Sequence, residues 1–397
     1  MSYQEWERFV RNDAKEIISG KLDDFSDLQF LKSEIGDKRI VWLGESSHNI
    51  KEIAELKFRI IRFLNKEMGF KTVVFESGFA QAYISNIAKN EIPSEILIYT
   101  IFFPIWCTSN NIDMLNYFRN NNMNIAGLDP NCSATKVLPH EVYSKFLSET
   151  SQTTLQLQAL DSLFMIYTWH RAKYFQSSKF YQKKQIKSLE YDRIYLQNAY
   201  IDLFRKIHQD YNFNNSLFGY QHSIWNNLLI LNKKNDTTQV EDFFLTNAER
   251  DSISAINLSY IYDSLFPGEK VIVWAHNGHI TKERYRDKKN NVLPTKHSIG
   301  HFLKGDLDSI SYRIAIYGFP SRTKGKIVDK SYEFRELQSN SPYEITFFSL
   351  QKYGVRKMFD RINLNENYPF SNRAYNCFDG IFYLRNVTRD KLIPLNN

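Results

Sequence analysis

Four short apolar segments of the chain have the length of buried β-strands and are flanked by polar residues. They are RIVWLGE (39–45), KTVVFES (71–77), NIAGLD (124–129) and KVIVWAH (270–276). Between the first two segments, the apolar residues recur at the spacing of one helix face, at Ile53, Leu56, Ile60 and Leu64. This alternation of strand, helix and strand predicts an α/β fold with a mostly parallel central sheet flanked by helices.

The helix between the first two strands carries start and stop signals. Asn49, followed three residues later by Glu52, resembles a capping pair, so the helix is expected to begin directly after His48. Gly69 is expected to end it. Two further strand candidates occur later in the chain, at residues 312–319 and 379–386.

The length of 397 residues exceeds what one hydrophobic core usually supports. Residues 141–250 are almost free of glycine and proline and show helix-period patterns with many aromatic residues. We therefore expect an inserted helical lobe at 141–250, between two halves of an α/β core at 1–140 and 251–397. The lobe is expected to cover a cleft at the carboxyl ends of the strands.

The composition argues against several classes of protein. The net charge is +7, but lysines and arginines alternate with acidic residues, which indicates a solvated surface more than a nucleic-acid site, even in the basic stretch 170–187. Three cysteines are too few for a disulfide framework or a cysteine-based metal site. Because no secretory signal or membrane-spanning segment is evident, we expect a cytoplasmic protein without a membrane or nucleic-acid partner; its oligomeric state stays open, with a monomer as one option.

Each of the four apolar segments is followed or ended by ionisable residues. In α/β proteins the carboxyl ends of parallel strands meet at one edge of the sheet, where ligands bind. The prediction is therefore that one edge collects two glutamates, an aspartate and three histidines: Glu45, His48, Glu76, Asp129, His276 and His279.

His48 is the candidate general base, because one imidazole nitrogen can accept a proton from water while the other is held by a carboxylate. Glu45 or Glu76 would fix the tautomer and raise the basicity of the ring. The alternative is a histidine that bonds only to the backbone of its turn. The stretch GESSH comes close to the nucleophile-elbow pattern, but the bulky His48 replaces its last glycine and makes Ser46 a poor nucleophile.

Three further groups each have more than one interpretation. His276 and His279 in WAHNGHI can bind a metal with a third ligand, stabilise an oxyanion, or bond locally to the chain. Arg59 belongs either to an ion-pair ladder along its helix or to a site, where it would orient a carboxylate or an ester oxygen. Arg250, before RDSISAIN, has the same two interpretations.

In order and spacing, GESSH, GFKTVVFES, AGLD, RDSISAIN, WAHNGHI and IYGF resemble the motifs of the erythromycin esterase family, over roughly residues 35 to 320. The resemblance implies hydrolysis of the lactone of 14-membered macrolides, and hence macrolide resistance, by activated water without a covalent intermediate, a cofactor or an obligatory metal. It implies that His48 is the family's catalytic base and that Glu45 and Glu76 are the carboxylates that support it. The family's second pair of histidines corresponds to His276 and His279, and the family's arginine corresponds to Arg59.

The macrolide is a large apolar ring with an amino sugar, so its cleft is expected to offer aromatic walls and acidic groups. Trp106, Asp129 and Arg250 are the residues expected to bind the macrolide. Two alternatives remain: a metal-dependent hydrolase of another ester or acyl substrate on the same fold, and a non-catalytic protein that binds haem or a metal.

Overall fold

The computed structural model describes residues 12–21, 23–134, 136, 152–175, 179–209, 216–232, 247–282, 298–303, 305–318, 341–351 and 374–394. The chain forms two compact units. Unit 1 comprises Met1–Glu76, Thr108–Asn124 and Leu258–Asn397, and unit 2 comprises Ser77–Cys107 and Ile125–Asn257. The predicted lobe of residues 141–250 falls within the sequence range of unit 2, and its boundaries stay a prediction.

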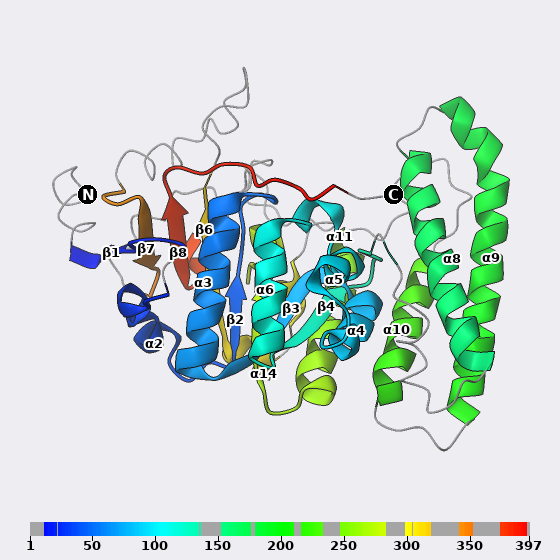
Figure 1. Ribbon diagram of the computed structural model, residues 1–397, viewed down its shortest axis with the longest axis horizontal. Helices are drawn as coiled ribbons and strands as arrows, with labels where there is room; N and C mark the ends of the chain where they lie inside the picture. Colours follow the sequence, from blue (N-terminus) through cyan, green and yellow to red (C-terminus); the bar gives the residue numbers. More distant parts are fainter. Residues whose placement is uncertain are drawn as a thin grey trace. The chain divides into compact units, whose positions relative to one another are not determined.

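The strands form an eight-stranded sheet with the order β1-β7-β8-β6-β2-β5-β3-β4 (Figure 1). Strand β2 pairs in parallel with β5 and β6, β3 pairs in parallel with β5, and β6 pairs in parallel with β8. Strand β7 runs antiparallel to β1 and β8. The sheet is mixed and mostly parallel, which confirms the predicted α/β class. The strands are β1 (Lys15–Glu16), β2 (Ile40–Leu43), β3 (Phe70–Gly78), β4 (Asn124–Asp129), β5 (Lys270–Trp274), β6 (Ser311–Tyr317), β7 (Ile345–Ser349) and β8 (Gly380–Leu384).

All four apolar segments and both later candidates form strands, so these six predictions are confirmed. Every residue of β2 is buried, as expected for a strand in the interior of a sheet that is covered on both faces. The central position of β2 places the residues that follow Leu43 between the ends of β5 and β6. Strands β1 and β7 were not predicted.

Helix α3 (Lys51–Met68) lies against the sheet and buries the predicted apolar face (Figure 1). It ends at Gly69, whose φ of 74° lies in the left-handed region that glycine adopts without steric cost. The predicted capping pair is wrong. Ile50 precedes the helix without a side-chain cap, and the Glu52 carboxylate instead accepts hydrogen bonds from the backbone N–H and the hydroxyl of Thr388.

The remaining helices of unit 1 are short, apart from α6, which lies beside α3 in front of the sheet in Figure 1. They are the 3₁₀ helix η1 (Ser26–Leu28), α2 (Phe30–Ile35), α6 (Ser109–Asn120), the π-helix η4 (Ile261–Leu265), α12 (Asn277–Ile280), α13 (Ile299–Phe302), α14 (Asp306–Ser309) and α17 (Ala374–Cys377). Helix α12 follows β5 directly and carries His279.

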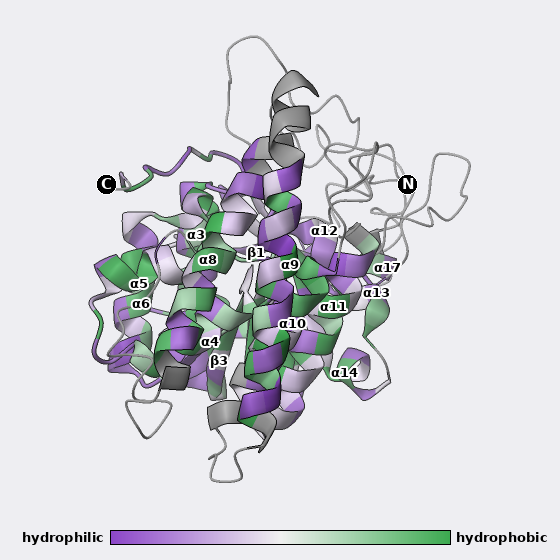
Figure 2. Cartoon of the chain, turned by 90° about the vertical axis from the view of Figure 1, so that its right-hand side faces the viewer, coloured by the Kyte–Doolittle hydropathy of each residue, from purple (hydrophilic) through white to green (hydrophobic). Residues whose placement is uncertain are grey.

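Unit 2 is largely helical. It contains α4 (Phe79–Ala88), α5 (Ser94–Ile101), η2 (Pro104–Trp106), α8 (Gln152–Phe175), α9 (Lys179–Gln209), α10 (Ser216–Leu231) and most of α11 (Asn247–Tyr260). Hydrophilic and hydrophobic residues alternate along α9 and α10 in Figure 2, the pattern of helices that bury one side. Among the helices in the described residues, none combines the length and the apolar character needed to cross a lipid bilayer.

Candidate active site

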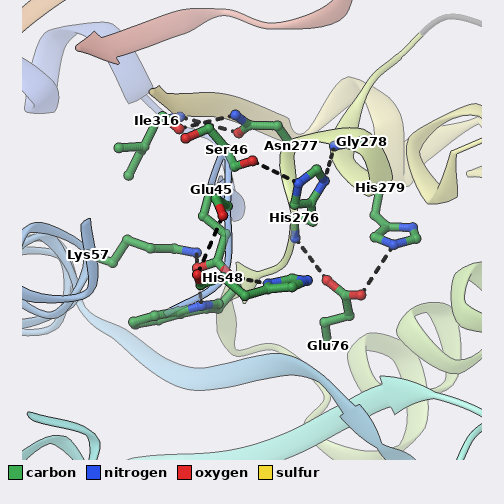
Figure 3. A network of polar contacts seen from close by, with 12 residues as sticks. Glu45, Ser46, His48, Lys57, Glu76, His276, Asn277, Gly278, His279 and Ile316 are labelled. Carbon is green, nitrogen blue, oxygen red and sulfur yellow. Dashed lines mark hydrogen bonds and ion pairs between the residues drawn. The ribbon is translucent and has the colours of Figure 1, made fainter. Parts of the chain in front are cut away.

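Glu45 lies two residues beyond β2 in unit 1 and is almost completely buried, with 3% of its surface exposed. Its Oε1 lies 2.6 Å from Nδ1 of His48, and its Oε2 accepts hydrogen bonds from Lys57 Nζ at 2.9 Å and Trp274 Nε1 at 3.0 Å (Figure 3). These contacts join three elements, since Lys57 lies on α3 and Trp274 ends β5. The carboxylate is therefore held from three directions.

The charges of this cluster are mutually dependent. Burial opposes ionisation of Glu45, but the Lys57 ammonium and the His48 hydrogen bond outweigh it and lower the pKa of the carboxyl to about 2. Burial lowers the pKa of Lys57 to about 8, against the opposing effect of Glu45. Burial also opposes protonation of His48, but Glu45 and Glu76 outweigh it and raise the pKa of the imidazole above its usual 6.5. Glu45 is thus ionised throughout the neutral range, and Lys57 is mostly charged at pH 7.

The contact with Glu45 determines the tautomer of His48. Because an ionised carboxylate only accepts hydrogen bonds, Nδ1 carries the proton and Nε2 is the basic nitrogen of the neutral ring. The side chain of His48 is 32% exposed, in contrast to its buried carboxylate partner. This combination of an oriented imidazole and a buried carboxylate is what a general base requires.

Glu76, near the end of β3, connects the two histidines of the turn after β5. Its Oε2 accepts the backbone N–H of His276 at 2.9 Å, and its Oε1 lies 3.2 Å from Nε2 of His279. The rings of His48 and His276 meet edge to face, with centroids 5.3 Å apart. The structure therefore brings together five of the predicted residues: Glu45, His48, Glu76, His276 and His279.

His276 uses both ring nitrogens for local hydrogen bonds. Nε2 donates to the carbonyl of Ser46 at 3.0 Å, and Nδ1 accepts the N–H of Gly278 at 3.0 Å (Figure 3). Burial lowers its pKa to about 4, so the ring is neutral at physiological pH. This geometry favours the local bonding role among the three that the sequence left open for His276.

Asn277 fixes the turn after β5 to the ends of two neighbouring strands. Its N–H donates to the Glu45 carbonyl at 2.8 Å, and its side chain exchanges two hydrogen bonds with the backbone of Ile316 in β6. A Cβ at Gly44 would overlap this side chain, so the glycine permits the close approach. Ser46 is 1% exposed and its hydroxyl donates to the Gly318 carbonyl at 3.1 Å, contacts that agree with its being a poor nucleophile candidate.

Lys57 belongs to this cluster but was not among the residues predicted from the sequence. It lies on the buried face of α3, one turn from Ile53 and from Ile61, and its ammonium sits 4.1 Å from the centre of the Trp274 ring. A lysine within the apolar stripe of an amphipathic helix was the available signal, since a buried ammonium needs an acidic partner.

Arg59, the predicted arginine, bonds elsewhere in unit 1. Its guanidinium forms an ion pair with Asp27 and donates to the carbonyls of Ser19 and Asp24, in the segment that precedes α2. These contacts favour the structural interpretation of Arg59. A catalytic role for it stays a prediction.

The three predicted substrate-binding residues lie in unit 2. Asp129, at the end of β4, is fully buried and accepts Nε of Arg250 at 2.9 Å and the N–H of Asn131 at 2.9 Å. Arg250 is on α11, and its side chain is 21% exposed. Trp106 is 5% exposed and contacts the rings of Phe102 and Phe103. Substrate binding by these residues stays a prediction.

A metal site is not evident in the described part of the chain. The described residues contain no group of three or more histidine, cysteine, aspartate or glutamate side chains that could bind a metal ion. The two carboxylates of the cluster instead bond to N–H groups and to the Lys57 ammonium.

Comparisons with protein families, with curated proteins and with solved structures all point to the same family. The family model described as Erythromycin esterase matches residues 66–327, more than half of the chain, which includes Glu76, His276 and His279. The protein named "Putative hydrolase YbfO" of Bacillus subtilis (strain 168) is 23% identical over 334 residues, which cover 79% of this chain and 72% of that protein. Erythromycin esterase type II of Escherichia coli is 38% identical over 86 residues, which cover 22% of this chain and 20% of that protein.

Among solved structures, a mutant of the erythromycin esterase EreC in its open conformation aligns with a TM-score of 0.63. The sequence identity is 17%, and the alignment covers 96% of this chain and 100% of that one, which shows a shared fold. The names of the family and of the Bacillus relative indicate an esterase-like hydrolase. The chain belongs to the erythromycin esterase family, as the resemblance of its motifs predicted.

Proposed function

We propose that this protein opens the lactone ring of 14-membered, erythromycin-like macrolides with a water molecule activated by His48. The observation that carries the proposal is the 2.6 Å contact between His48 Nδ1 and a buried Glu45 that Lys57 keeps ionised. The names of the family model and of the Escherichia coli relative support the choice of substrate.

In the proposed reaction, Nε2 of His48 removes a proton from water while the oxygen attacks the lactone carbonyl. The imidazolium that forms is stabilised by the ionised Glu45, at Nδ1. Collapse of the tetrahedral intermediate breaks the carbon–oxygen bond of the ring, and the proton passes from His48 to the departing alkoxide. The product is a hydroxy acid that contains one more water than the substrate, and the enzyme is regenerated without a covalent intermediate.

The developing negative charge on the carbonyl oxygen needs a donor. We assign this role to His279 in its protonated form, in which Nε2–H is held by Glu76 and Nδ1–H donates to the carbonyl oxygen. His276 contributes indirectly, because its hydrogen bonds to Ser46 and Gly278 fix the turn on which His279 lies. Trp106, Asp129 and Arg250 are proposed to bind the macrolide, with Arg250 the most exposed of the three.

The direct test is to incubate the purified protein with erythromycin in ¹⁸O-labelled water and to follow the mass of the drug. We expect a product one water heavier, with the label in its carboxyl group. A parallel incubation with a 16-membered macrolide measures the ring-size range. Recovery of unchanged erythromycin between mildly acidic and mildly basic pH would refute the macrolide assignment, and simple aryl and alkyl esters would then be tested with the same protein.

A further inference from the structure

The segment after β8 runs back over the turn that carries His48. In Figure 1 the red C-terminal segment leaves β8 and crosses the end of α3 toward α6, all within unit 1. Residues 388–390, which we call the C-terminal strap, lie beyond residue 327, where the match to the family model ends. Their contacts are therefore a property of this chain that the family match does not cover.

Backbone hydrogen bonds join the strap to residues 49–51 as a short antiparallel bridge. Lys51 N donates to the Thr388 carbonyl at 3.0 Å, Asp390 N donates to the Asn49 carbonyl at 3.2 Å, and Ile50 pairs with Arg389. Asn49 has a φ of 60°, a left-handed conformation that an asparagine adopts at some cost and that surrounding contacts must maintain. The bridge supplies such contacts on the residue next to His48.

Side-chain hydrogen bonds at His48 and at Glu52 add to the bridge. Arg389 Nη1 donates to the carbonyl of His48 at 2.8 Å, and both oxygens of Glu52 accept hydrogen bonds from Thr388, at 2.6 and 2.7 Å. The strap is anchored further along by Asp390, which accepts Asn110 Nδ2 at 2.9 Å, and by a bridge between Leu392 and Thr108. It is thus tied to the start of α6 as well as to the start of α3.

We propose that the C-terminal strap is a positioning element that holds the backbone of His48 so that its imidazole stays aligned with Glu45, with Arg389 as the main positioning residue. The proposal rests on the proposed role of His48 as the base. Arg389 is exposed and its contact is with a backbone carbonyl, so its removal should disturb alignment more than folding. Alignment matters because a small displacement of a catalytic group can cost about 100-fold in rate.

The experiment compares the wild type with three variants: Arg389→Ala, Arg389→Lys and Lys391→Ala. Arg389→Lys keeps a charged donor for the His48 carbonyl, whereas Arg389→Ala removes both the donor and the charge. Lys391 is the matched control, because it is an exposed cation two residues further along whose side chain has no bond to residues 48–52. Thermal unfolding is measured for every variant.

Two readouts are used, and one of them does not depend on turnover. The first is the NMR titration of ¹⁵N-labelled histidines, with the His48 signals assigned by comparison with His48→Asn. The groups that set this titration are Glu45, Glu76 and Lys57. The second is kcat and KM with the macrolide.

For Arg389→Ala we expect the hydrogen-bonded Nδ1 proton of His48 to broaden or vanish and the pKa of His48 to fall toward its ordinary value. We expect kcat to fall at least about tenfold with little change in KM, because alignment rather than binding is lost. Arg389→Lys should recover most of both properties, and Lys391→Ala should match the wild type.

Three outcomes would overturn the proposal. In the first, Arg389→Ala has the wild-type titration and kcat. In the second, the pKa of His48 rises, which indicates only the loss of a nearby cation. In the third, kcat falls together with the melting temperature while the His48 signals are unchanged, which indicates a general structural role. If the wild type hydrolyses no macrolide, the proposed function fails, but the titration of His48 still decides whether the strap positions it.

Discussion

Lys57 is a fully buried lysine whose ammonium bonds to Glu45 and lies over the Trp274 ring. Its position shows how a single residue links stability to chemistry. The ammonium keeps Glu45 ionised, and it also opposes protonation of His48 through its positive charge. Glu45 therefore raises the pKa of His48, and Lys57 limits this rise.

The pH dependence of the reaction follows from these shifts. Only neutral His48 accepts a proton from water, and its pKa lies above 6.5, so kcat/KM should rise with pH through a value above 6.5. In Lys57→Met the restraining cation is lost, the pKa of His48 rises further, and the rise in kcat/KM should move to higher pH. Lys57→Arg keeps the charge and should move it less.

The same variant carries a cost in stability. Removal of one partner of a buried ion pair leaves an uncompensated charge, so Lys57→Met should reduce the free energy of unfolding by about 3–5 kcal/mol. Denaturant unfolding at the pH of each assay separates this loss from the change in kinetics. A pH profile of folded Lys57→Met that coincides with that of the wild type would show that Lys57 does not act on the base.

Among the elements, the site draws on three adjacent parallel strands: residues that follow β2 and β5, and Glu76 near the end of β3. Asn277 fixes the turn after β5 to two neighbouring strands. It bonds to the backbone of Glu45, just beyond β2, and to the backbone of Ile316 in β6. Asn277 begins helix α12, which is four residues long. The position of so short a helix depends on such contacts rather than on its own helical stability.

Asn277→Ala should therefore affect both stability and activity. It leaves the buried backbone groups of Ile316 without their side-chain partner, at a cost of about 1–3 kcal/mol for each unsatisfied group. The turn that carries His279 should also loosen, and kcat should fall. Asn386→Ala is the control, because Asn386 is exposed and its side chain, within the described residues, bonds to Glu344 on the surface. Equal melting temperatures and rates for the two variants would contradict the role given to Asn277.

The sequence predicted the elements better than their arrangement. Six strands were identified from apolar segments, since a buried strand needs such a segment whatever its neighbours are. The short antiparallel strands β1 and β7 and the order of the sheet were not predicted, because pairing joins residues far apart in the chain, such as Trp42 and Arg313. The cap of α3 was assigned wrongly because Glu52 has a partner 336 residues away, Thr388.

At the scale of the whole molecule, the rule that strand ends meet at one edge correctly brought Glu45, His48, Glu76, His276 and His279 together. It did not identify the contacts that orient them. Lys57 lies on a helix rather than at a strand end, and Arg389 reaches His48 across 341 residues of sequence. Asp129 follows the same rule, but its carboxylate is bonded to Arg250 within unit 2.

The donor set of the cluster predicts that hydrolysis does not need a metal. Glu45 and Glu76 have their oxygens bonded to N–H groups and to an ammonium, and no metal-binding set of three side chains occurs in the described residues. Dialysis against a chelator should leave kcat/KM unchanged, with metal content measured on the same sample. A loss of activity that added zinc restores would contradict this prediction.

His48 is the proposed general base of this hydrolase. The most direct test is the rate of macrolide hydrolysis by His48→Asn between pH 5 and 9, with melting temperatures as the control for folding. The side chain of His48 is partly exposed, so we expect the variant to fold normally and to lose about 10²–10⁴-fold in kcat, together with the rise in rate above pH 6.5. A folded His48→Asn protein with the rate and pH profile of the wild type would contradict the claim.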